Sequence, residues 1–146
     1  MAFLQAFNIS GSGMSAERFR MDIIAENIAN IHTTRDENNE PYRRKIVTFQ
    51  ARPVTAFSEY YSASKNRAIG NGVKVVSVTK DYETDFVMTY DPANPDADEN
   101  GYVSYPNVNT VTEMTNLIDA QRAYEANATA IDGIKSMTQS AFSIGQ

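Results

Sequence analysis

The chain of 146 residues contains no cysteine and one histidine, His32. It therefore has no disulfide framework and no thiolate metal site, and most catalytic and metal-binding constellations that need several imidazoles are excluded. No run approaches the roughly 18 apolar residues that a transmembrane helix needs. The opening segment MAFLQAFN has neither a basic stretch nor an apolar core. We expect no cleaved secretory signal, as in a cytoplasmic protein or in one exported by a route that reads no such signal.

An excess of positive charge is also lacking. Lysine and arginine number 13 against 18 aspartates and glutamates, which gives a net charge of -5. General nucleic-acid binding rests on neutralising phosphates, and the one basic cluster, Arg43 to Lys45, is too short to provide this. With 42% hydrophobic and 21% charged residues, the chain is expected to form one domain, or a small domain with extensions.

The N-terminal region carries apolar residues at steps of four and three, which is typical of a coiled-coil seam on a helix. The positions concerned are Phe3, Phe7, Ser10, Met14, Glu17, Met21, Ile24, Ile28 and Ile31. Residues 10–13, SGSG, contain two glycines that cost about 2 kcal/mol of helix propensity, and we predict a break or hinge there in the free chain. Asn27 flanks the seam, where a buried amide fixes register and partner choice at some cost in stability. The alternative, an asparagine exposed at the surface, fits Asn30 better.

The middle of the chain changes period. Residues 32–41 are polar and end in proline, which is typical of a loop. Strands are predicted at 44–51 and 73–79, with a weaker candidate at 85–90, because these segments are rich in β-branched residues and partly alternate. Residues 52–69 show no period and are interpreted as an insertion or irregular loop, and 90–103 as a turn-rich loop.

A long second helix is predicted after Pro106, capped by Asn107 or Asn109 and about 55 Å long. Its apolar stripe follows Met114, Leu117, Gln121, Tyr124, Ala128 and Ile131, and then continues in a shifted phase through Ile134, Met137, Ala141 and Ile144. Asn127 lies beside this stripe as Asn27 does beside the first.

Together these patterns predict an α+β fold, in which long N- and C-terminal helices form a coiled-coil bundle with neighbours around a small β-rich middle domain. The expected segments are an N-terminal helical segment at 1–34, a middle domain at 35–106 with its insertion at 52–69, and a C-terminal helix at 107–146. A coiled-coil seam has to pack against another helix. The two terminal helices could pair with each other, but the second is longer than the first, so part of its apolar surface is left for partners. The predicted assembly seam is Met14, Met21, Ile24, Asn27, Ile28, Ile31, Met114, Leu117, Gln121, Tyr124, Asn127, Ala128 and Ile131.

Two other functional classes remain open at this point. The acidic loop contains Asp91, Asp96, Asp98 and Glu99, which would serve a metal-binding or hydrolytic protein. An EF-hand read from Asn94 needs Gly at its sixth and Glu at its twelfth position, and the chain has Glu99 and Tyr105, so a solvated turn is favoured. A soluble coiled-coil adaptor that never polymerises is the other class. We predict no enzyme activity, no metal site and no cofactor.

Two segments resemble a known family. Residues 27–50, NIANIHTTRDENNEPYRRKIVTFQ, resemble the N-terminal signature of flagellar rod, hook and related axial proteins. Residues 90–137 resemble the C-type proximal-rod members of that family, through the loop Asp-Pro-x-x-Pro-x-Ala-Asp-x-x-Gly-Tyr-Val and the helix entry Pro-Asn-Val-Asn. Ile31 and His32 depart from the small residues usual after the first motif, and nothing is carried over to 52–69.

The resemblance implies a structural subunit of the flagellar basal-body rod, which transmits torque. Such proteins pass unfolded through the flagellar type III export apparatus without a cleaved signal and assemble in the periplasm into a helical hetero-oligomer. Their terminal helices form the inner tube and the β-rich part lies outside. Implied partners are other proximal-rod proteins, the basal adaptor and the distal-rod protein. The family's N-terminal export element, Phe-x-x-x-hydrophobic, is matched by Phe3 and Phe7, whose alternative role is seam packing.

Overall fold

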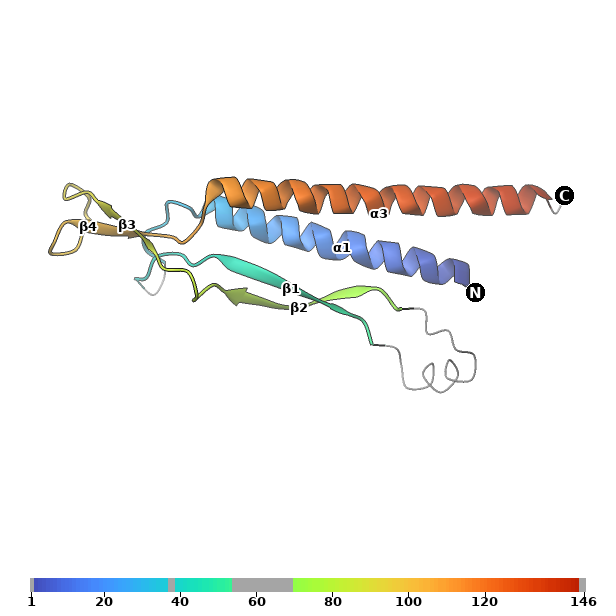
Figure 1. The fold of residues 1–146 in the computed structure, drawn as a ribbon, viewed down its shortest axis with the longest axis horizontal. Coiled ribbons are helices and arrows are strands. Elements are labelled where there is room, and N and C mark those ends of the chain that lie inside the picture. Colours follow the sequence, from blue (N-terminus) through green and yellow to red (C-terminus); the bar gives the residue numbers. More distant parts are fainter. Residues whose placement is uncertain (1, 37–38, 54–69, 145–146) are drawn as a thin grey trace. The chain divides into compact units, whose positions relative to one another are not determined.

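The computed structural model describes residues 2–36, 39–53 and 70–144 (Figure 1). Within these ranges the elements are, in chain order, α1 (Ala2–Ala29), β1 (Lys45–Ala51), β2 (Val73–Lys80), β3 (Val87–Tyr90), β4 (Tyr102–Tyr105) and α3 (Thr110–Ile144). Two terminal helices and two small sheets confirm the α+β prediction. The proposed insertion at 52–69 lies outside the described residues from 54 onwards.

The chain forms two compact units. The first contains residues 1–19, 48–77 and 120–146, and the second contains residues 20–47 and 78–119. Both units include a part of α1, of α3 and of the β1–β2 hairpin, so each has its own helix–helix and helix–strand contacts. The division of the chain into segments 1–34, 35–106 and 107–146 stays a prediction.

The predicted break at residues 10–13 is wrong, because α1 runs unbroken through SGSG. In the first unit Ser12 is buried, its hydroxyl donates to the Ile9 carbonyl at 2.7 Å, and it accepts the N–H of Val73 at 3.0 Å. A Cβ added to Gly13 would lie 3.0 Å from the amide of Asn127. The small side chains therefore let a strand and α3 approach α1 closely, and this packing offsets their poor helix propensity.

β1 and β2 form the first hairpin, as predicted for 44–51 and 73–79. Backbone bonds at its two ends, from Arg52 N–H to Gly72 C=O and from Asp81 N–H to Arg44 C=O, are both 2.8 Å long and show that the strands are antiparallel. Half-buried and exposed side chains alternate along both strands, which is the period of a sheet covered on one face.

Gly72 carries a specific requirement at the start of β2, since its φ is +89° and an added Cβ would lie 2.2 Å from Ser12 Oγ. Gly72→Ala is expected to lower the free energy of unfolding by about 1–3 kcal/mol, because a non-glycine residue is strained at this φ and Ser12 must move. Urea unfolding followed by circular dichroism measures the change. Gly70→Ala is the matched control, because nothing lies within 4 Å of a Cβ added there. Equal stability of the two variants would contradict the prediction.

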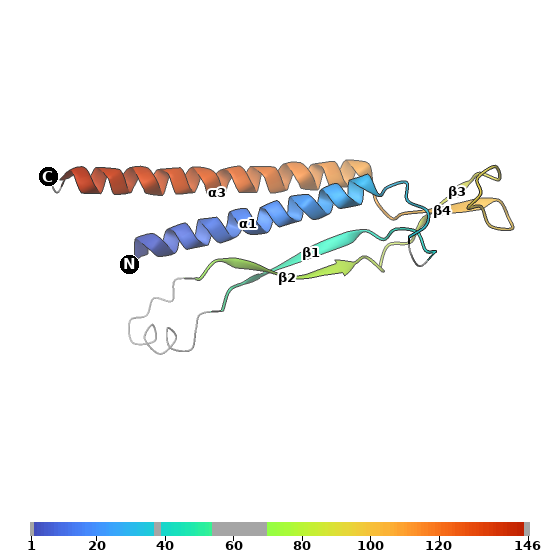
Figure 2. The same ribbon diagram turned by 180° about the vertical axis from the view of Figure 1, so that it is seen from behind.

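β3 and β4 form a second antiparallel hairpin, with Val87 opposite Tyr105 and Tyr90 opposite Tyr102 (Figure 2). The sequence predicted β3 but placed β4 partly in a loop, because four residues directly after a turn-rich stretch show too little alternation. All four residues of β3 are exposed. A short hairpin that is uncovered on this strand needs other contacts for its stability.

α3 begins after Asn109, whose side-chain oxygen accepts the N–H groups of Val111 at 3.0 Å and Thr112 at 3.1 Å. Asn109 is therefore the N-cap, and Asn107, the other candidate, is buried elsewhere. With 35 residues the helix is about 52 Å long.

The covered face of α3 differs from the predicted stripe at two positions, where the residue before the predicted one is buried instead. Leu117, Tyr124 and Ile131 are half-buried as expected, but Met114 and Gln121 are exposed. The predicted phase shift is absent, since buried and half-buried positions alternate at steps of four and three along Glu113, Leu117, Ala120, Tyr124, Asn127, Ile131, Ile134 and Thr138.

Candidate assembly surface

A buried polar cluster in the second unit joins α1, α3 and the chain before β1. Glu113 of α3 is 0% exposed, although a charged side chain is rarely buried without partners. Its carboxylate accepts from Asn27 Nδ2 at 3.0 Å, from Arg44 Nε at 2.9 Å and from Arg44 Nη2 at 2.7 Å. Hydrogen bonds to a charged group are stronger than neutral ones, so the cluster joins the three segments firmly.

Asn27 is the second member of this cluster and is 1% exposed. Its amide nitrogen donates to the Lys45 carbonyl at 2.9 Å as well as to Glu113, and its oxygen accepts the N–H of Lys45 at 2.9 Å and the hydroxyl of Tyr42 at 2.9 Å. Burial, with the negative charges of Glu26 and Glu113 nearby, raises the pKa of Tyr42 well above its usual value. Asn27 is thus fully hydrogen-bonded, which explains why α1 carries an asparagine on a buried face.

Asn107 and Asp81 extend the cluster to the loop before β3. Asn107 accepts the N–H of Arg44 at 2.9 Å and donates to the carbonyls of Asp81 and Thr84, both at 3.1 Å. The Asp81 carboxylate accepts the N–H groups of Glu83 at 3.0 Å and Thr84 at 3.1 Å. Burial alone would raise the pKa of Asp81, but hydrogen bonds from Thr84 and Glu83 and the charge of Arg44 outweigh it and lower this pKa.

The lowered pKa of Asp81 predicts a pH-dependent stability. Its ionised form contributes fully above about pH 4 and loses the contribution as pH falls through the folded-state pKa. Asp81→Asn keeps an oxygen that accepts hydrogen bonds, so it is expected to cost about 1 kcal/mol at pH 7 and progressively less towards pH 2. Urea unfolding at several pH values measures this difference. The exposed Asp85→Asn should stay within about 0.5 kcal/mol of the parent throughout, and a pH-independent loss in Asp81→Asn would contradict the charge argument.

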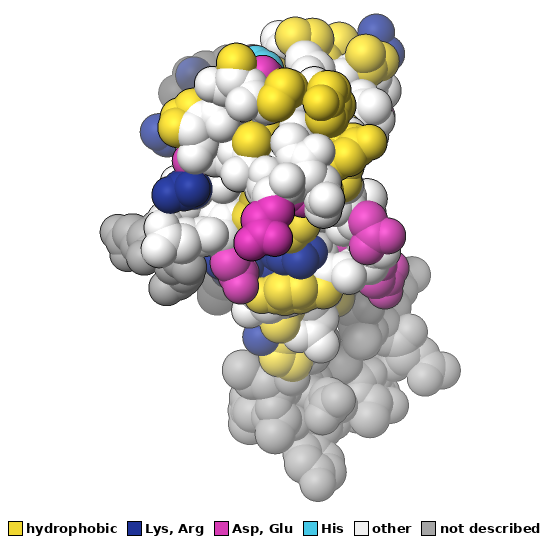
Figure 3. All heavy atoms as spheres, turned by 90° about the vertical axis from the view of Figure 1, so that its left-hand side faces the viewer, with side chains coloured by type: hydrophobic (Ala, Val, Ile, Leu, Met, Phe, Trp, Pro, Cys, Tyr) yellow, Lys and Arg dark blue, Asp and Glu magenta, His cyan; other side chains and the backbone are white. Residues whose placement is uncertain are grey.

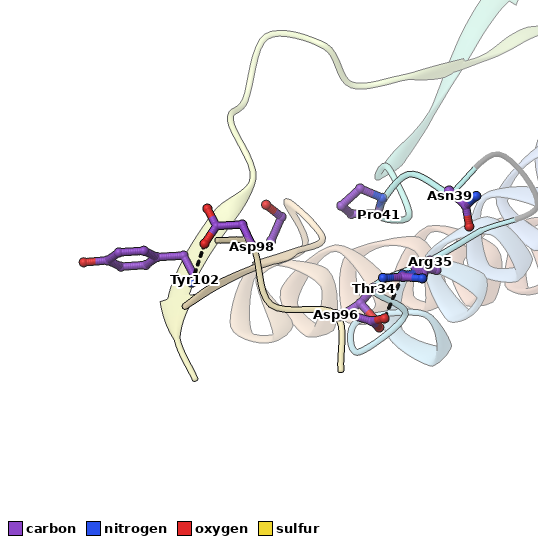
Figure 4. A pocket seen from close by; sticks show the side chains of 8 residues that line it. Thr34, Arg35, Asn39, Pro41, Asp96, Asp98 and Tyr102 are labelled. Carbon is purple, nitrogen blue, oxygen red and sulfur yellow. Dashed lines mark hydrogen bonds and ion pairs between the residues drawn. The ribbon is translucent and has the colours of Figure 1, made fainter. Parts of the chain in front are cut away.

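In the acidic loop between β3 and β4, the carboxylates of Asp96 and Asp98 form ion pairs and hydrogen bonds within the unit. Asp96 forms an ion pair with Arg35 at 2.7 Å and accepts the hydroxyl of Thr34 at 2.5 Å, beside a cavity of about 400 Å³ (Figure 4). Asp98 accepts the N–H groups of Asn100 at 2.9 Å and Tyr102 at 2.8 Å. Within the described parts of the chain no three His, Cys, Asp or Glu side chains form a group that could hold a metal ion.

The predicted seam residues fall into three groups, which are buried, half-buried and exposed. Ile24 is 6% exposed and Asn27 is buried, and those that are half-buried are Met14, Met21, Ile28, Ile31, Leu117, Tyr124, Asn127, Ala128 and Ile131. Met114 and Gln121 point to solvent. Of the proposed export element, Phe7 is half-buried and the side chain of Phe3 lies outside the described ones.

Large apolar side chains remain exposed on both helices and on the β3–β4 hairpin. On α3, Val111, Met114 and Ile118 are exposed at spacings of three and four residues, which places them on one face. Sequence reasoning selected only Met114 of the three, and it missed Glu113, Arg44 and Asn107 as buried partners. Nor does any helix described here have the length and apolar character needed to span a membrane.

Comparison with known proteins identifies the family. A family model described as "Flagella basal body rod protein" matches residues 7–35, and one described as "Flagellar basal body rod FlgEFG protein C-terminal" matches residues 99–144. The flagellar basal-body rod protein FlgC of Bacillus subtilis (strain 168) is 41% identical over 152 aligned residues, with 100% of both chains covered. FlgC of Borreliella burgdorferi is 41% identical with 100% of this chain and 99% of the relative covered, and FlgC of Salmonella typhimurium is 38% identical with 100% of both covered. The chain belongs to the FlgC family of flagellar basal-body rod proteins.

Proposed function

We propose that this protein is a structural subunit of the proximal part of the flagellar rod, and that it assembles with other rod proteins into the drive shaft that transmits torque. The observation that supports this best is the uncovered apolar face of α3, where Val111 is 75% exposed and Met114 is 52% exposed. An apolar stripe beside an already covered one is typical of a helix that packs against further helices. The FlgC relatives, which match along the full chain, support packing of this kind in a rod.

The buried cluster connects the two helices and the chain before β1 by hydrogen bonds, as a subunit that transmits torque requires. Glu113, Asn27 and Arg44 join α1, α3 and the chain before β1 by directional bonds of 2.7–3.0 Å, and apolar packing alone is less specific in register. We infer that this cluster keeps the two helices from sliding past each other under torque. No step of this function requires a catalytic residue.

The partners follow from the family. We propose that the chain contacts other proximal-rod proteins, the basal adaptor protein and the distal-rod protein in a hetero-oligomeric helical assembly, located in the rod where it crosses the periplasmic space. We also propose export through the flagellar type III apparatus without a cleaved signal peptide. Phe3 and Phe7 are the proposed export element, with packing in the assembled seam as the other role.

Deletion of the gene tests the proposal. The deletion strain is expected to build no complete rod, to lack filaments and not to swim, and a plasmid copy should restore all three. Electron microscopy of purified basal bodies and swimming in soft agar are the measurements. Complete rods in the deletion strain would contradict the proposal. A small soluble complex of defined mass, with no fraction anchored in the envelope, would favour an adaptor instead.

A further inference from the structure

An apolar groove of about 330 Å³ lies in the second unit, where the β3–β4 hairpin meets the end of α1 and the entry to α3. Its lining includes Ile31, Val87, Tyr105 and Val108, and it contains no Asp, Glu, Lys or Arg. The ring of His32 stands edge-on to Tyr105 at 6.5 Å between centroids. The volume lies at the lower end of the range found for small-ligand sites.

The surroundings of this groove are acidic. Every charged residue between positions 81 and 121 is an aspartate or a glutamate. Asp81 and Glu113 face Arg44, and Asp96 pairs with Arg35, so these three are compensated within the unit. Among the described residues no ion pair is seen for Asp85, which lies two positions before Val87 and is exposed. Seen from the hairpin end, hydrophobic side chains gather beside acidic ones (Figure 3).

The C-terminal end of α3, in the first unit, has the opposite character. After Asp132 the only charged side chain is Lys135. Phe142 is 75% exposed, and it follows Lys135 by seven residues, which puts both on the same face of the helix. Met137 is also exposed, but it lies on another face. An aromatic ring with a cation two turns away matches an apolar groove in which the lining residue Val87 follows Asp85 by two positions.

The same chain cannot make this contact. α3 is one continuous helix, and Phe142 lies 32 positions after its first residue, Thr110, which corresponds to about 48 Å along the helix. Phe142 can therefore fill only a groove on another molecule. The charges favour pairing of these two different surfaces, because the groove region carries acidic residues and the helix end carries a lysine. Two surfaces of opposite sign attract each other, whereas two like surfaces repel.

We propose that Phe142 of one copy inserts into the groove beside Val87 and Tyr105 of a second copy, with Lys135 facing Asp85. This inference rests on the proposed rod function and names one of its subunit contacts. The contact is heterologous, because different surfaces of the two molecules meet, and repeated contacts of this type produce an open helical assembly.

Site-specific disulfide cross-linking tests the contact, since the chain has no cysteine of its own. One full-length copy carries Val87→Cys and a differently tagged copy carries Phe142→Cys. Mild oxidation is expected to join them at least tenfold more efficiently than it joins Val87→Cys to Met137→Cys. The control residue is as accessible but faces elsewhere, and disulfide geometry demands Cα atoms within about 7 Å. Equal yields for the two pairs would overturn the contact.

A charge exchange tests the electrostatic part. Lys135→Glu is expected to reduce the cross-link about tenfold, and combining it with Asp85→Lys on the other copy should restore most of the yield. Failure of the second change to restore it would remove Asp85 from the proposal. Capture of another rod protein by Phe142→Cys through a cysteine-to-amine cross-linker in cells, with no disulfide to Val87→Cys, would contradict the assignment to a second copy. Normal rods without any cross-link to Val87→Cys would refute the contact while leaving the rod function intact.

Discussion

Replacing Glu113 with alanine is expected to lower the free energy of unfolding by about 3–5 kcal/mol, which is a large part of the stability of a domain of this size. The carboxylate is completely buried and accepts one hydrogen bond from Asn27, two from Arg44 and a longer one of 3.5 Å from Asn116. Its removal leaves the Asn27 donor without one partner and the Arg44 guanidinium with only the more distant Asp81, at 3.9 Å. The cost is mainly that of buried groups left unpaired.

Urea unfolding followed by circular dichroism measures the loss, with Glu125→Ala as the control. Glu125 lies on the same helix but is exposed, and its bond to Gln121, 3.0 Å long, joins residues four apart. Its removal should cost less than about 0.5 kcal/mol. A loss in Glu113→Ala as small as that of the control would show that the cluster does not hold the helices.

A double replacement separates the pair's own contribution from the penalty of breaking it. Arg44→Met with Glu113→Leu removes both charges and keeps apolar volume, so it is expected to cost less than Glu113→Ala alone. Rod assembly then gives a second readout. If the double variant is stable but builds fewer rods, the cluster specifies register; if it is stable and assembles normally, the cluster contributes stability only.

The helices could be predicted from the sequence because apolar residues recur at steps of four and three. Residues at this spacing lie on one face of a helix. Leu117, Tyr124 and Ile131 were identified in this way. Glu113 was not, since a pattern of apolar residues assigns a carboxylate to the solvent side. Its burial depends on Arg44, which is 69 residues away along the chain and has no local signal.

The remaining differences also come from tertiary contacts. Helix propensity predicts a break at the SGSG segment. In the structure Ser12 accepts a hydrogen bond from the Val73 N–H, and the missing side chain of Gly13 leaves room for Asn127. Neither contact can be inferred from the local sequence. Strand β4 was missed because it is defined by its pairing with β3. For Asn27, an amide beside an apolar stripe suggested a role in register and partner choice, and this role stays a prediction. The structure shows the Asn27 side chain bonded to α3, to Lys45 and to Tyr42.

Ile24→Asp and Ile28→Asp are expected to abolish rod assembly and swimming. Ile24 is buried in α1, and replacing it loses about 1.5–3 kcal/mol of apolar burial and adds the cost of a carboxylate without a partner. The sum of the two costs approaches the whole free energy of unfolding of a domain. The helix is therefore expected to unfold, or to stay folded only with the new carboxylate protonated. Soft-agar motility and the yield of purified rods measure the effect. Ala25→Asp, exposed on the same turn, adds the same charge and should leave motility close to normal.

Ile28 distinguishes folding from assembly because it is only half-buried in the single chain. Ile28→Asp is expected to reduce the free energy of unfolding of the purified protein less than Ile24→Asp, by about 1–2 kcal/mol, and still to stop assembly. That combination is expected if the exposed part of Ile28 is covered by a neighbouring subunit, where the new carboxylate would lose its water. Normal swimming with Ile28→Asp would exclude Ile28 from the subunit contact. Loss of stability equal to that of Ile24→Asp would mean that the residue acts within the chain.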